Sequence, residues 1–231
     1  MKILCVSDHI DPLVYSVQAK ERFKDIDLVV SAGDLPMEYL GFLASTFNLP
    51  VIFVFGNHNL EALHLFRRTK DPTQVGKLTV NLRNYYGSTY AGDRSVRAGG
   101  LIFVGLGGSM RYNNGKNQFS DAQMMWRIIR LIPRLILNKL LHRRYLDILL
   151  THAPPLGIHD RSDPPHRGFK SFLWFMRTFK PRYLLHGHIH LYDLNARRVT
   201  RYHETRVINV YDHYLLTLGS EEAGESGDED E

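Results

Sequence analysis

Five short polar motifs of aspartate, asparagine and histidine follow apolar runs of the chain. They contain Asp8 in "SDHID", Asp34 in "AGD", Asn57 and His58 in "GNHN", His152 in "THAPP", and His188 and His190 in "HGHIH". Carboxylate, imidazole and amide oxygen are suitable ligands for borderline divalent metals such as manganese, iron, cobalt, nickel and zinc. The absence of thiolates argues against a closed structural zinc site. The residue types therefore indicate a divalent metal site of another kind.

The position of these motifs strengthens that interpretation. A single histidine after a strand is a weak signal, but five motifs in series would bring their side chains to one edge of a sheet, where sites in open α/β sheets assemble. His188 and His190 would point to opposite sides in a regular strand. In a loop behind Gly187 they could instead reach two adjacent ions. A carboxylate such as Asp34 can bridge two metals about 3.5–4 Å apart, as in hydrolytic two-metal sites.

The elements that must position these residues are short and apolar. Continuous apolar runs favour strands that are buried on both faces, and we expect them at Lys2–Val6, Asp27–Ser31, Pro50–Phe55, Leu101–Leu106, Leu146–Thr151 and Arg182–His186. Helical patterns at Tyr39–Phe47 and Gly168–Phe179 lie between them. This alternation predicts a layered α/β fold. Hairpin strands are expected near the end, at Arg198–Arg201, Thr205–Val210 and Tyr214–Leu218.

Composition limits the class of protein. The chain has 231 residues, 44% of them apolar, and a single cysteine, Cys5, which we interpret as a core residue in a reducing compartment. The N-terminus does not have the pattern of a secretory signal, and no run is as apolar as a transmembrane helix. We therefore expect a cytoplasmic protein, with peripheral membrane contact left open. We expect one domain over residues 1–218 and a tail over residues 219–231.

Charge is distributed unevenly. The net charge is +5, yet the last twelve residues, "SEEAGESGDEDE", contain seven Asp or Glu and no Lys or Arg. Such an acidic run of low hydrophobicity is typical of a disordered tail. The rest of the chain carries about +12. A basic body favours an anionic partner, such as a phosphorylated substrate, a nucleic acid or a membrane surface, although it can also serve solubility alone.

The segment Asp121–Tyr145 is the longest helical pattern. Arg127, Arg130, Arg134 and Asn138 recur at spacings of three or four and predict one polar stripe, with apolar residues around it. Pro133 should kink or split the helix. Two interpretations stay open: a helix pair that covers the sheet, or an apolar lid or membrane-facing element rimmed by arginine.

The ordered series "GD", "GNH", "TH" and "GHxH" resembles the calcineurin-like metallophosphoesterases from about Lys2 to Leu218. The resemblance implies a four-layer αββα sandwich of the metallo-dependent phosphatase type, with two divalent metals at the strand ends, expected to be manganese, iron or zinc. By the same resemblance Asp34 would be the bridging ligand. Asn57, His152 and His188 would complete one metal, and Asp8 and His190 would serve the other.

The resemblance also implies a reaction. His58 matches the catalytic histidine of the family, and would stabilise the developing charge or protonate the leaving oxygen. The implied chemistry is in-line attack on phosphorus by a metal-bridging water or hydroxide. "HRG" offers His166 and Arg167 as candidate substrate-binding residues at the start of a helix, where backbone amides favour an anion. A plain helix start explains them equally well.

The sequence departs from the family pattern at two positions. Ile10 stands where the first motif would have a histidine ligand. Three hypotheses follow: Asp11 supplies the missing ligand, His9 does so from a rearranged loop, or the Asp8 side has three protein ligands plus water. Asp11 can also be a helix cap. Asn59 replaces a frequent aspartate after His58. Asn59 could hold the imidazole by a hydrogen bond but could not stabilise its charged form as a carboxylate would.

The leading hypothesis is a metal-dependent phosphatase or phosphodiesterase. The alternative is a protein of the same fold that has lost turnover and works as a binding or scaffolding module. The family's remaining ligand and catalytic positions are all occupied as expected, which favours the enzyme. We expect a phosphorylated small-molecule or lipid substrate. Because the sequence contains no recognisable nucleic-acid motif, nucleic acid is not expected as the primary partner.

Overall fold

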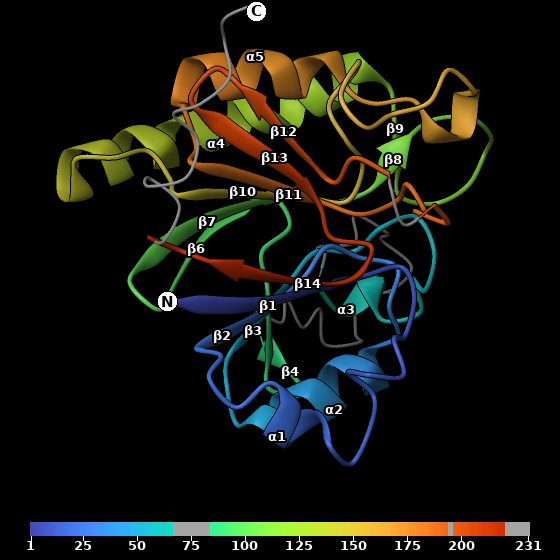
Figure 1. The fold of residues 1–231 in the computed structure, drawn as a ribbon. Coiled ribbons are helices and arrows are strands. Elements are labelled where there is room, and N and C mark those ends of the chain that lie inside the picture. Colours follow the sequence, from blue (N-terminus) through green and yellow to red (C-terminus); the bar gives the residue numbers. More distant parts are fainter. Residues whose placement is uncertain (67–83, 194–195, 220–231) are drawn as a thin grey trace, which may run out of the picture.

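The computed structural model describes residues 1–66, 84–193 and 196–219. Within these residues, twelve strands form two six-stranded sheets (Figure 1). The first sheet has the order β14 (Asp212–Thr217), β1 (Lys2–Ser7), β2 (Leu28–Ser31), β3 (Val51–Phe53), β5 (Ser88–Tyr90) and β4 (Asn84–Tyr85). The second has the order β12 (Val199–Tyr202), β13 (Thr205–Asn209), β11 (Tyr183–His186), β10 (Ile148–Thr151), β7 (Leu101–Leu106) and β6 (Arg94–Ala98).

The central strands of both sheets are parallel, and the outer strands are antiparallel. In the first sheet β1, β2, β3 and β5 pair in parallel. In the second sheet β7, β10, β11 and β13 do the same. The carboxyl ends of the parallel strands within each sheet therefore lie at one edge. A short third sheet pairs β8 (Ser109–Met110) with β9 (Gln118–Phe119) after β7.

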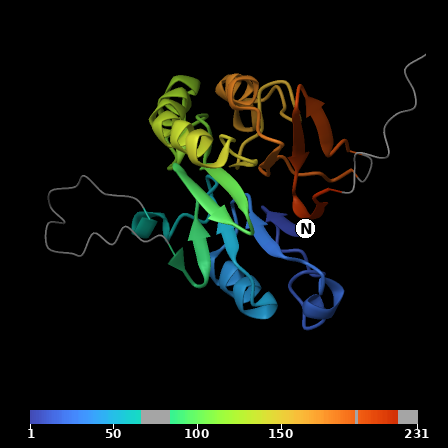
Figure 2. The ribbon, with the colours of Figure 1, turned by 90° about the vertical axis from the view of Figure 1, so that its left-hand side faces the viewer.

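Helices cover the outer faces of the two sheets (Figure 2). The first sheet carries α1 (Ala19–Arg22), α2 (Met37–Phe47) and α3 (Leu63–Phe66), which share a hydrophobic core with it. The second carries α4 (Asp121–His142) and α5 (Lys170–Phe179), which lie side by side over another core. A third core of residues such as Ile52, Phe103 and Leu150 lies between the sheets. The layers are thus αββα, as expected from the resemblance.

The burial of the central strands explains why continuous apolar runs in the sequence predicted them. Residues 3–7 of β1 and all residues of β2, β3, β10 and β11 are buried, because each strand has a core on both faces. The expected strands are all present, with bounds that differ by up to two residues. Cys5 lies in the core between the sheets, as predicted. The sequence patterns did not reveal the short or partly exposed strands β4, β5, β6, β8 and β9.

The last strand corrects one expectation. We expected β14 to belong to a group of hairpin strands at the end of the chain. β12 and β13 do form a hairpin, but β14 leaves that sheet and pairs antiparallel with β1 of the other sheet. Leu216 faces the core between the sheets, which stabilises this crossing. The tail that we expected from residue 219 lies, from residue 220 onward, outside the described residues.

The long helix α4 is continuous through Pro133, so it is not split in two. Its start is fixed by a capping box, in which the Ser120 hydroxyl accepts from the Gln123 amide and the Gln123 side chain accepts from the Ser120 amide. The predicted polar stripe is wrong in part. Asn138 is buried and Arg127 is largely buried, whereas Arg130 and Arg134 are exposed. Among the described residues, none of the helices combines the length and hydropathy of a membrane-spanning segment.

Candidate metal centre

Asp34, His152 and His188 come together at the carboxyl ends of β2, β10 and β11. One ligand atom from each lies within 4.8 Å of the others. His152 Nε2 is 3.2 Å from Asp34 Oδ2 and 3.2 Å from the amide oxygen Oδ1 of Asn57, which follows β3. Three other predicted ligands therefore surround His152, which is fully buried, and the four come from both sheets.

Hydrogen bonds to the backbone fix which nitrogen of each histidine faces the cluster. His152 Nδ1 is 2.9 Å from the Ala32 carbonyl, so Nδ1–H donates to it and Nε2 is left facing Asp34 and Asn57. His188 Nε2 is 2.7 Å from the Pro165 carbonyl and donates to it, which leaves Nδ1 as its ligand atom. Partners of this kind set the tautomer and ring orientation of metal-binding histidines.

Asp8 and His190 form the adjoining part of the cluster. Asp8 is buried at the end of β1, and its Oδ2 accepts a 2.8 Å hydrogen bond from the His188 amide. His190 Nε2 lies 3.8 Å from Asp8 Oδ1. The other ring nitrogen of His190 contacts the Tyr192 hydroxyl at 2.9 Å, and its ring stacks on Tyr211 with centroids 4.8 Å apart. The structure thus brings together all six residues that the resemblance names as ligands.

Left-handed backbone conformations turn the motifs towards the cluster. Asp8, Asp34 and His188 have φ of 66°, 58° and 66°, a region that residues other than glycine rarely adopt. Such conformations cost of order 1–3 kcal/mol each and persist where the surrounding structure enforces them. Gly56 and Gly187 allow close approaches, because Cβ atoms there would lie 2.0 Å from Asp34 Oδ1 and 2.2 Å from Asp8 Oδ2. The glycines of "GNH" and "GHIH" are therefore steric requirements of the site.

The electrostatics of the buried groups favour a cation at this place. Burial opposes protonation of His152, but the Asp34 carboxylate and the more distant Asp8 outweigh it and raise its pKa to about 9. Burial alone would raise the pKa of Asp34, yet His152 and the His58 amide lower it to about 2. Burial and the neighbouring His152 lower the pKa of His188 to about 3. Burial raises the pKa of Asp8. Two buried carboxyl groups beside histidine nitrogens and an amide oxygen form a donor set that fits a divalent metal.

His58 lies beside this cluster with an exposed side chain. Its backbone amide donates to Asp34 Oδ1 at 2.7 Å, and this bond fixes the backbone position from which the imidazole side chain extends. We expected that Asn59 could hold the His58 ring. Instead, the Asn59 amide group donates to the Asp34 carbonyl at 2.9 Å. Asn59 therefore braces the loop around the carboxylate ligand.

The residues around Ile10 have other partners. The Asp11 carboxylate accepts from the Leu13 amide at 2.8 Å and contacts His213 through its other oxygen, as expected for a turn-capping residue. His9 Nδ1 contacts Asp212 at 2.7 Å, away from the cluster. Ile10 packs against the core beneath the first sheet. This geometry favours the hypothesis that the Asp8 side has fewer protein ligands, and the ligand role of Asp11 stays a prediction.

The "HRG" residues lie at the rim of the cluster. The His166 ring is 5.6 Å from the His188 ring, centroid to centroid, and its Nδ1 contacts Asp163. The Gly168 amide donates to Asp160 and the Ser171 amide to Asp121. These two amides at the start of α5 are thus satisfied by carboxylates of the chain. The expected anion-binding role therefore rests on side chains.

A hollow of about 430 Å³ opens next to this rim and is lined by three basic side chains, of which Arg167 belongs to "HRG". Its lining includes the basic Arg111, Arg167 and Lys170, and the acidic Asp121. Arg111 donates to the Gln123 side chain at 2.9 Å. The hollow adjoins the cluster because η2, the 3₁₀ helix Pro164–His166 that carries the Pro165 carbonyl, packs on β8.

Two residues of the loop 107–119 contribute to the site and were not singled out by their sequence context. The Asn117 amide group donates to the Phe55 carbonyl at 3.3 Å and also to the Gly56 carbonyl, which holds the start of "GNH". The Tyr112 hydroxyl lies 3.5 Å from the Asn57 amide nitrogen. No sequence signal pointed to these contacts.

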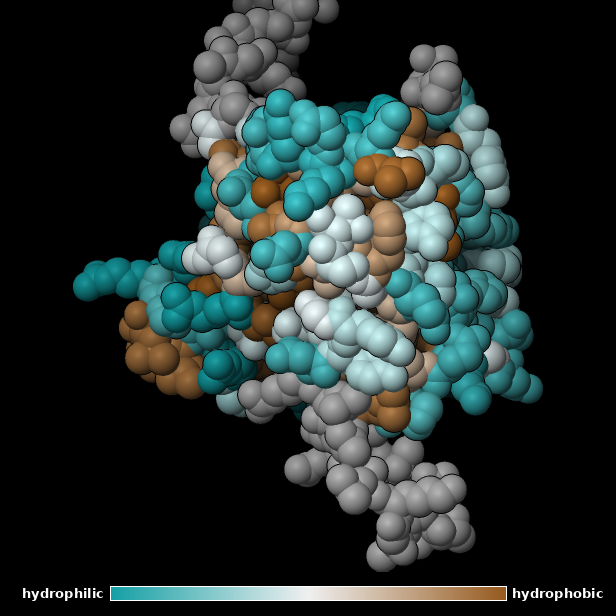
Figure 3. Space-filling view, turned by 90° about the horizontal axis from the view of Figure 1, so that it is seen from below, coloured by the Kyte–Doolittle hydropathy of each residue, from teal (hydrophilic) through white to brown (hydrophobic). Residues whose placement is uncertain are grey.

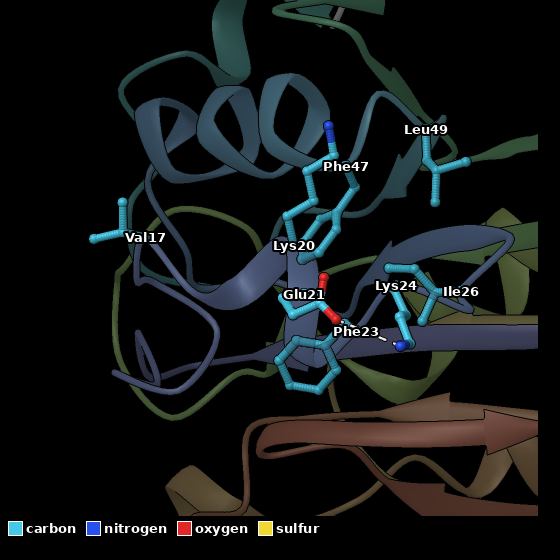
Figure 4. A pocket seen from close by; sticks show the side chains of 8 residues that line it. All are labelled: Val17, Lys20, Glu21, Phe23, Lys24, Ile26, Phe47 and Leu49. Atoms are coloured by element: carbon cyan, nitrogen blue, oxygen red, sulfur yellow. Dashed lines mark hydrogen bonds and ion pairs between the residues drawn. The ribbon is translucent and has the colours of Figure 1, made fainter.

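A second hollow, of about 510 Å³, lies between α1 and α2 (Figure 4). It contains the ion pair Lys24–Glu21, at 3.4 Å, beside the aromatic rings of Phe23 and Phe47. None of the expected ligands lines it. The chemistry-bearing residues are therefore gathered at the strand ends instead.

Known proteins share both the sequence pattern and the fold. The calcineurin-like phosphoesterase family model matches residues 1–192. The UPF0046 protein K07C11.7 of Caenorhabditis elegans is 25% identical over 205 residues, which cover 82% of this chain but only 63% of that protein. One crystal structure aligns with a TM-score of 0.61 at 12% identity, covering 93% of this chain and 94% of that chain. The crystal structure of TT1561 of Thermus thermophilus aligns with a TM-score of 0.54 at 12% identity, covering 91% and 89%. These structural matches show the fold, and because the family model spans most of the sequence, the chain belongs to the calcineurin-like phosphoesterase family.

Proposed function

We propose that the chain is a metal-dependent phosphoesterase that hydrolyses a phosphomonoester or phosphodiester at the cluster described above. The observation that carries the proposal is the convergence of Asp34, His152 and His188 within 4.8 Å. Asp34, Asn57, His152 and His188 would hold one ion, and Asp8 and His190, with Asp34 shared, would hold a second. Manganese, iron and zinc all suit these ligands. Divalent ions held there would lower the pKa of a water molecule and offset the charge of the phosphoryl oxygens.

The chain's own residues have distinct roles in this proposal. His58 would donate a proton to the leaving oxygen or stabilise its developing charge, because its side chain is exposed beside the cluster. Ala32 and Pro165 orient the two buried histidines through their carbonyl groups. Asn59 and Asn117 hold the loop that carries Asn57 and His58. Pre-positioned groups need no rearrangement during the reaction.

The substrate would be an anion that also contacts the rim. Arg167 and Lys170, with Arg111, face the hollow beside the cluster and would attract a second phosphate or a carboxylate of the substrate. His166 would contact the same side of the substrate. A phosphorylated small molecule and a phospholipid both present such chemistry. The single, buried Cys5 is consistent with a reducing, cytoplasmic setting.

The test is turnover after metal removal and reconstitution. The chain is stripped with EDTA, reloaded with Mn²⁺, Fe²⁺ or Zn²⁺, and assayed on p-nitrophenyl phosphate and bis-p-nitrophenyl phosphate. Asp34→Asn should lose metal binding in calorimetry together with activity, whereas His58→Ala should retain the metal and lose roughly 10²–10⁴-fold in kcat. His64→Ala, at an exposed histidine whose ring contacts the nearby Glu61 carbonyl, serves as the matched control.

The outcomes separate the enzyme from the alternative. Turnover in the reloaded chain that falls in both variants and not in the control supports a phosphoesterase. Metal binding without turnover above the His58→Ala background would favour a binding or scaffolding module. The ratio of rates on the two substrates distinguishes a phosphatase from a phosphodiesterase.

A further inference from the structure

Helix α4 has a buried face that is sufficient to hold it in place. Met124, Ile128, Leu131 and Leu135 are buried in the core that α4 shares with α5 and the second sheet. Polar anchors add to this packing. Arg127 donates to Asp93 and to the Gly107 carbonyl, both at 2.7 Å, and the guanidinium carbon lies 4.2 Å from the centre of the Phe119 ring.

The end of the helix is anchored as well. The amide group of Asn138 donates to the Ser95 hydroxyl at 2.9 Å and to the Tyr145 carbonyl at 3.0 Å. The N-terminal capping box fixes the other end. Nothing in this arrangement requires the opposite face of the helix to be apolar, because that face contacts neither the core nor these anchors.

The opposite face is nevertheless apolar along most of its length. Leu140, Leu141 and Trp126 are 75%, 65% and 63% exposed. The exposed apolar residues of the helix recur at spacings of three, four and one and so form a continuous stripe: Trp126, Ile129, Pro133, Ile136, Leu137, Leu140 and Leu141. Single exposed apolar residues are common, but a contiguous stripe marks an interaction surface.

The stripe lies on a part of the molecule that a large surface could reach. The C-terminal half of α4 projects beyond the edge of the second sheet (Figure 1). Seen from below, hydrophobic side chains gather at the left-hand edge of the molecule, where this end of the helix projects (Figure 3). The C-terminal part of the stripe is therefore not at the bottom of a groove.

The charged side chains of the segment that carries the stripe all have the same sign. Between residues 122 and 146 the chain has six Lys or Arg and no Asp or Glu. Arg130 and Arg134 are exposed and flank the stripe, and the Arg130 guanidinium carbon is 5.9 Å from the centre of the Trp126 ring. Lys139 and Arg143 add exposed basic positions near the C-terminal end. A tryptophan-containing apolar face rimmed by cations is the pattern of helices that lie in the interface of a membrane.

We propose that the outer face of α4 docks on an anionic lipid surface, with the stripe inserted among the acyl chains and the basic rim against the headgroups. A second copy of the chain fits this face poorly. In a symmetric dimer Arg130 and Arg134 of both copies would crowd around the two-fold axis with no acidic residue of the helix to offset them. The acidic tail, "SEEAGESGDEDE", matches the charge but has no large apolar side chain to cover the stripe.

The docked helix also runs to the rim of the metal centre. Its first residue, Asp121, lines the hollow that Arg111 and Arg167 share. Docking would therefore place that rim beside the membrane surface, where anionic substrates are concentrated. The docking itself does not depend on the proposed phosphoesterase activity, so its test requires no turnover.

The test is co-sedimentation of the full chain with vesicles of phosphatidylcholine, with and without phosphatidylserine, at low and high salt. The wild-type chain should pellet with the phosphatidylserine vesicles and be released by salt. Ile136→Gln/Leu140→Gln should weaken the partition at least ~10-fold. Arg130→Gln/Arg134→Gln should weaken it roughly fivefold for each charge removed. Val17→Gln and Lys20→Gln, at exposed positions of the other helical layer, are the matched controls and should bind as the wild type does.

Fluorescence gives a second measurement that does not depend on pelleting. In a Trp174→Phe chain, Trp126 is the remaining tryptophan, and brominated lipids should quench it if the stripe is inserted. Equal binding by the α4 variants and wild type, absence of quenching, or no binding at all would overturn the proposal. A concentration-dependent dimer in analytical ultracentrifugation that Ile136→Gln/Leu140→Gln abolishes would overturn it in favour of self-association.

Discussion

The carboxylate of Asp8 accepts a 2.8 Å hydrogen bond from the backbone amide of His188, 180 positions later in the sequence. This contact joins the end of β1 in the first sheet to the loop after β11 in the second. Both residues have a left-handed backbone conformation with φ of 66°. The proposed metal centre is therefore built across the two sheets, and its geometry depends on how closely these loops approach.

Gly187 controls that approach. A Cβ atom at this position would lie 1.9 Å from Ser7 Oγ and 2.2 Å from Asp8 Oδ2. We expect Gly187→Ala to push Asp8 away from His188, to destabilise the fold by roughly 1–3 kcal/mol, and to lower the affinity for divalent metal. Metal titration by calorimetry and urea unfolding measure both effects. The control for metal affinity is Gly100→Ala, where a Cβ atom meets nothing within 4 Å but a φ of 78° strains alanine, so this variant should lose stability without losing metal. Equal metal affinity in the two variants would contradict the steric argument.

Asn117 should matter for the metal centre although it is not a ligand. Its amide group donates to the Phe55 and Gly56 carbonyls, and Asn117→Ala leaves the Gly56 carbonyl without this donor, whereas the Phe55 carbonyl keeps the Gly108 amide. We expect a loss of about 1–3 kcal/mol in the free energy of unfolding, together with weaker metal binding. Asn113→Ala is the control, because Asn113 is exposed in the same loop and caps only the Gly115 amide. If Asn117→Ala binds metal as Asn113→Ala does, the loop does not support the site.

The basic rim should affect substrate capture more than chemistry. Arg167→Gln/Lys170→Gln removes two positive charges from the hollow beside the cluster. For a substrate with a second anionic group, we expect KM to rise roughly tenfold at low salt with kcat little changed. For p-nitrophenyl phosphate, which lacks such a group, the change should be smaller. Lys20→Gln, on the other helical layer, provides the comparison. A fall in kcat with unchanged KM would show that the hollow does not bind the substrate.

A contact between the half-buried His159 and the buried His186, outside the cluster, should make stability depend on pH. His159 lies 2.9 Å from His186 and 2.9 Å from the Thr200 hydroxyl. Burial and the nearby Arg197 lower the pKa of His159 from 6.5 to about 4. The unfolded chain therefore takes up this proton at a higher pH than the folded chain does. The contribution of neutral His159 to the free energy of unfolding is therefore fully present above about pH 6.5 and is lost as the pH falls towards 4.

The measurement is urea unfolding of the metal-free chain at about pH 7.5 and about pH 5. On going from the higher to the lower pH, the free energy of unfolding of His159→Asn should fall by about 2 kcal/mol less than that of the wild type. Asparagine suits the site because His159 has φ of 60°. His203→Asn, at an exposed position with φ of 52°, is the matched control and should follow the wild type. An unchanged pH dependence in His159→Asn would assign the effect to other groups.

The sequence by itself determined the fold class, the central strands and the residues that meet at their ends. β1, β2, β3, β10 and β11 are nearly continuous apolar runs because each has a core on both faces, and burial on both faces is what a sequence records most clearly. The motifs that follow them carry residue types with one common chemistry, so they could be assigned before any distance was known.

Only the tertiary structure decided the contacts that are remote in sequence. Three such contacts depend on how the two sheets pack, which local sequence patterns do not encode. They are the pairing of β14 with β1, the hydrogen bond from Asn59 to Asp34, and the hydrogen bond from Asn117 to the Gly56 carbonyl. The same is true of α4. Its sequence has apolar residues on nearly all sides, and the packing of Met124 and Leu135 inward is what leaves Trp126 and Leu140 facing outward.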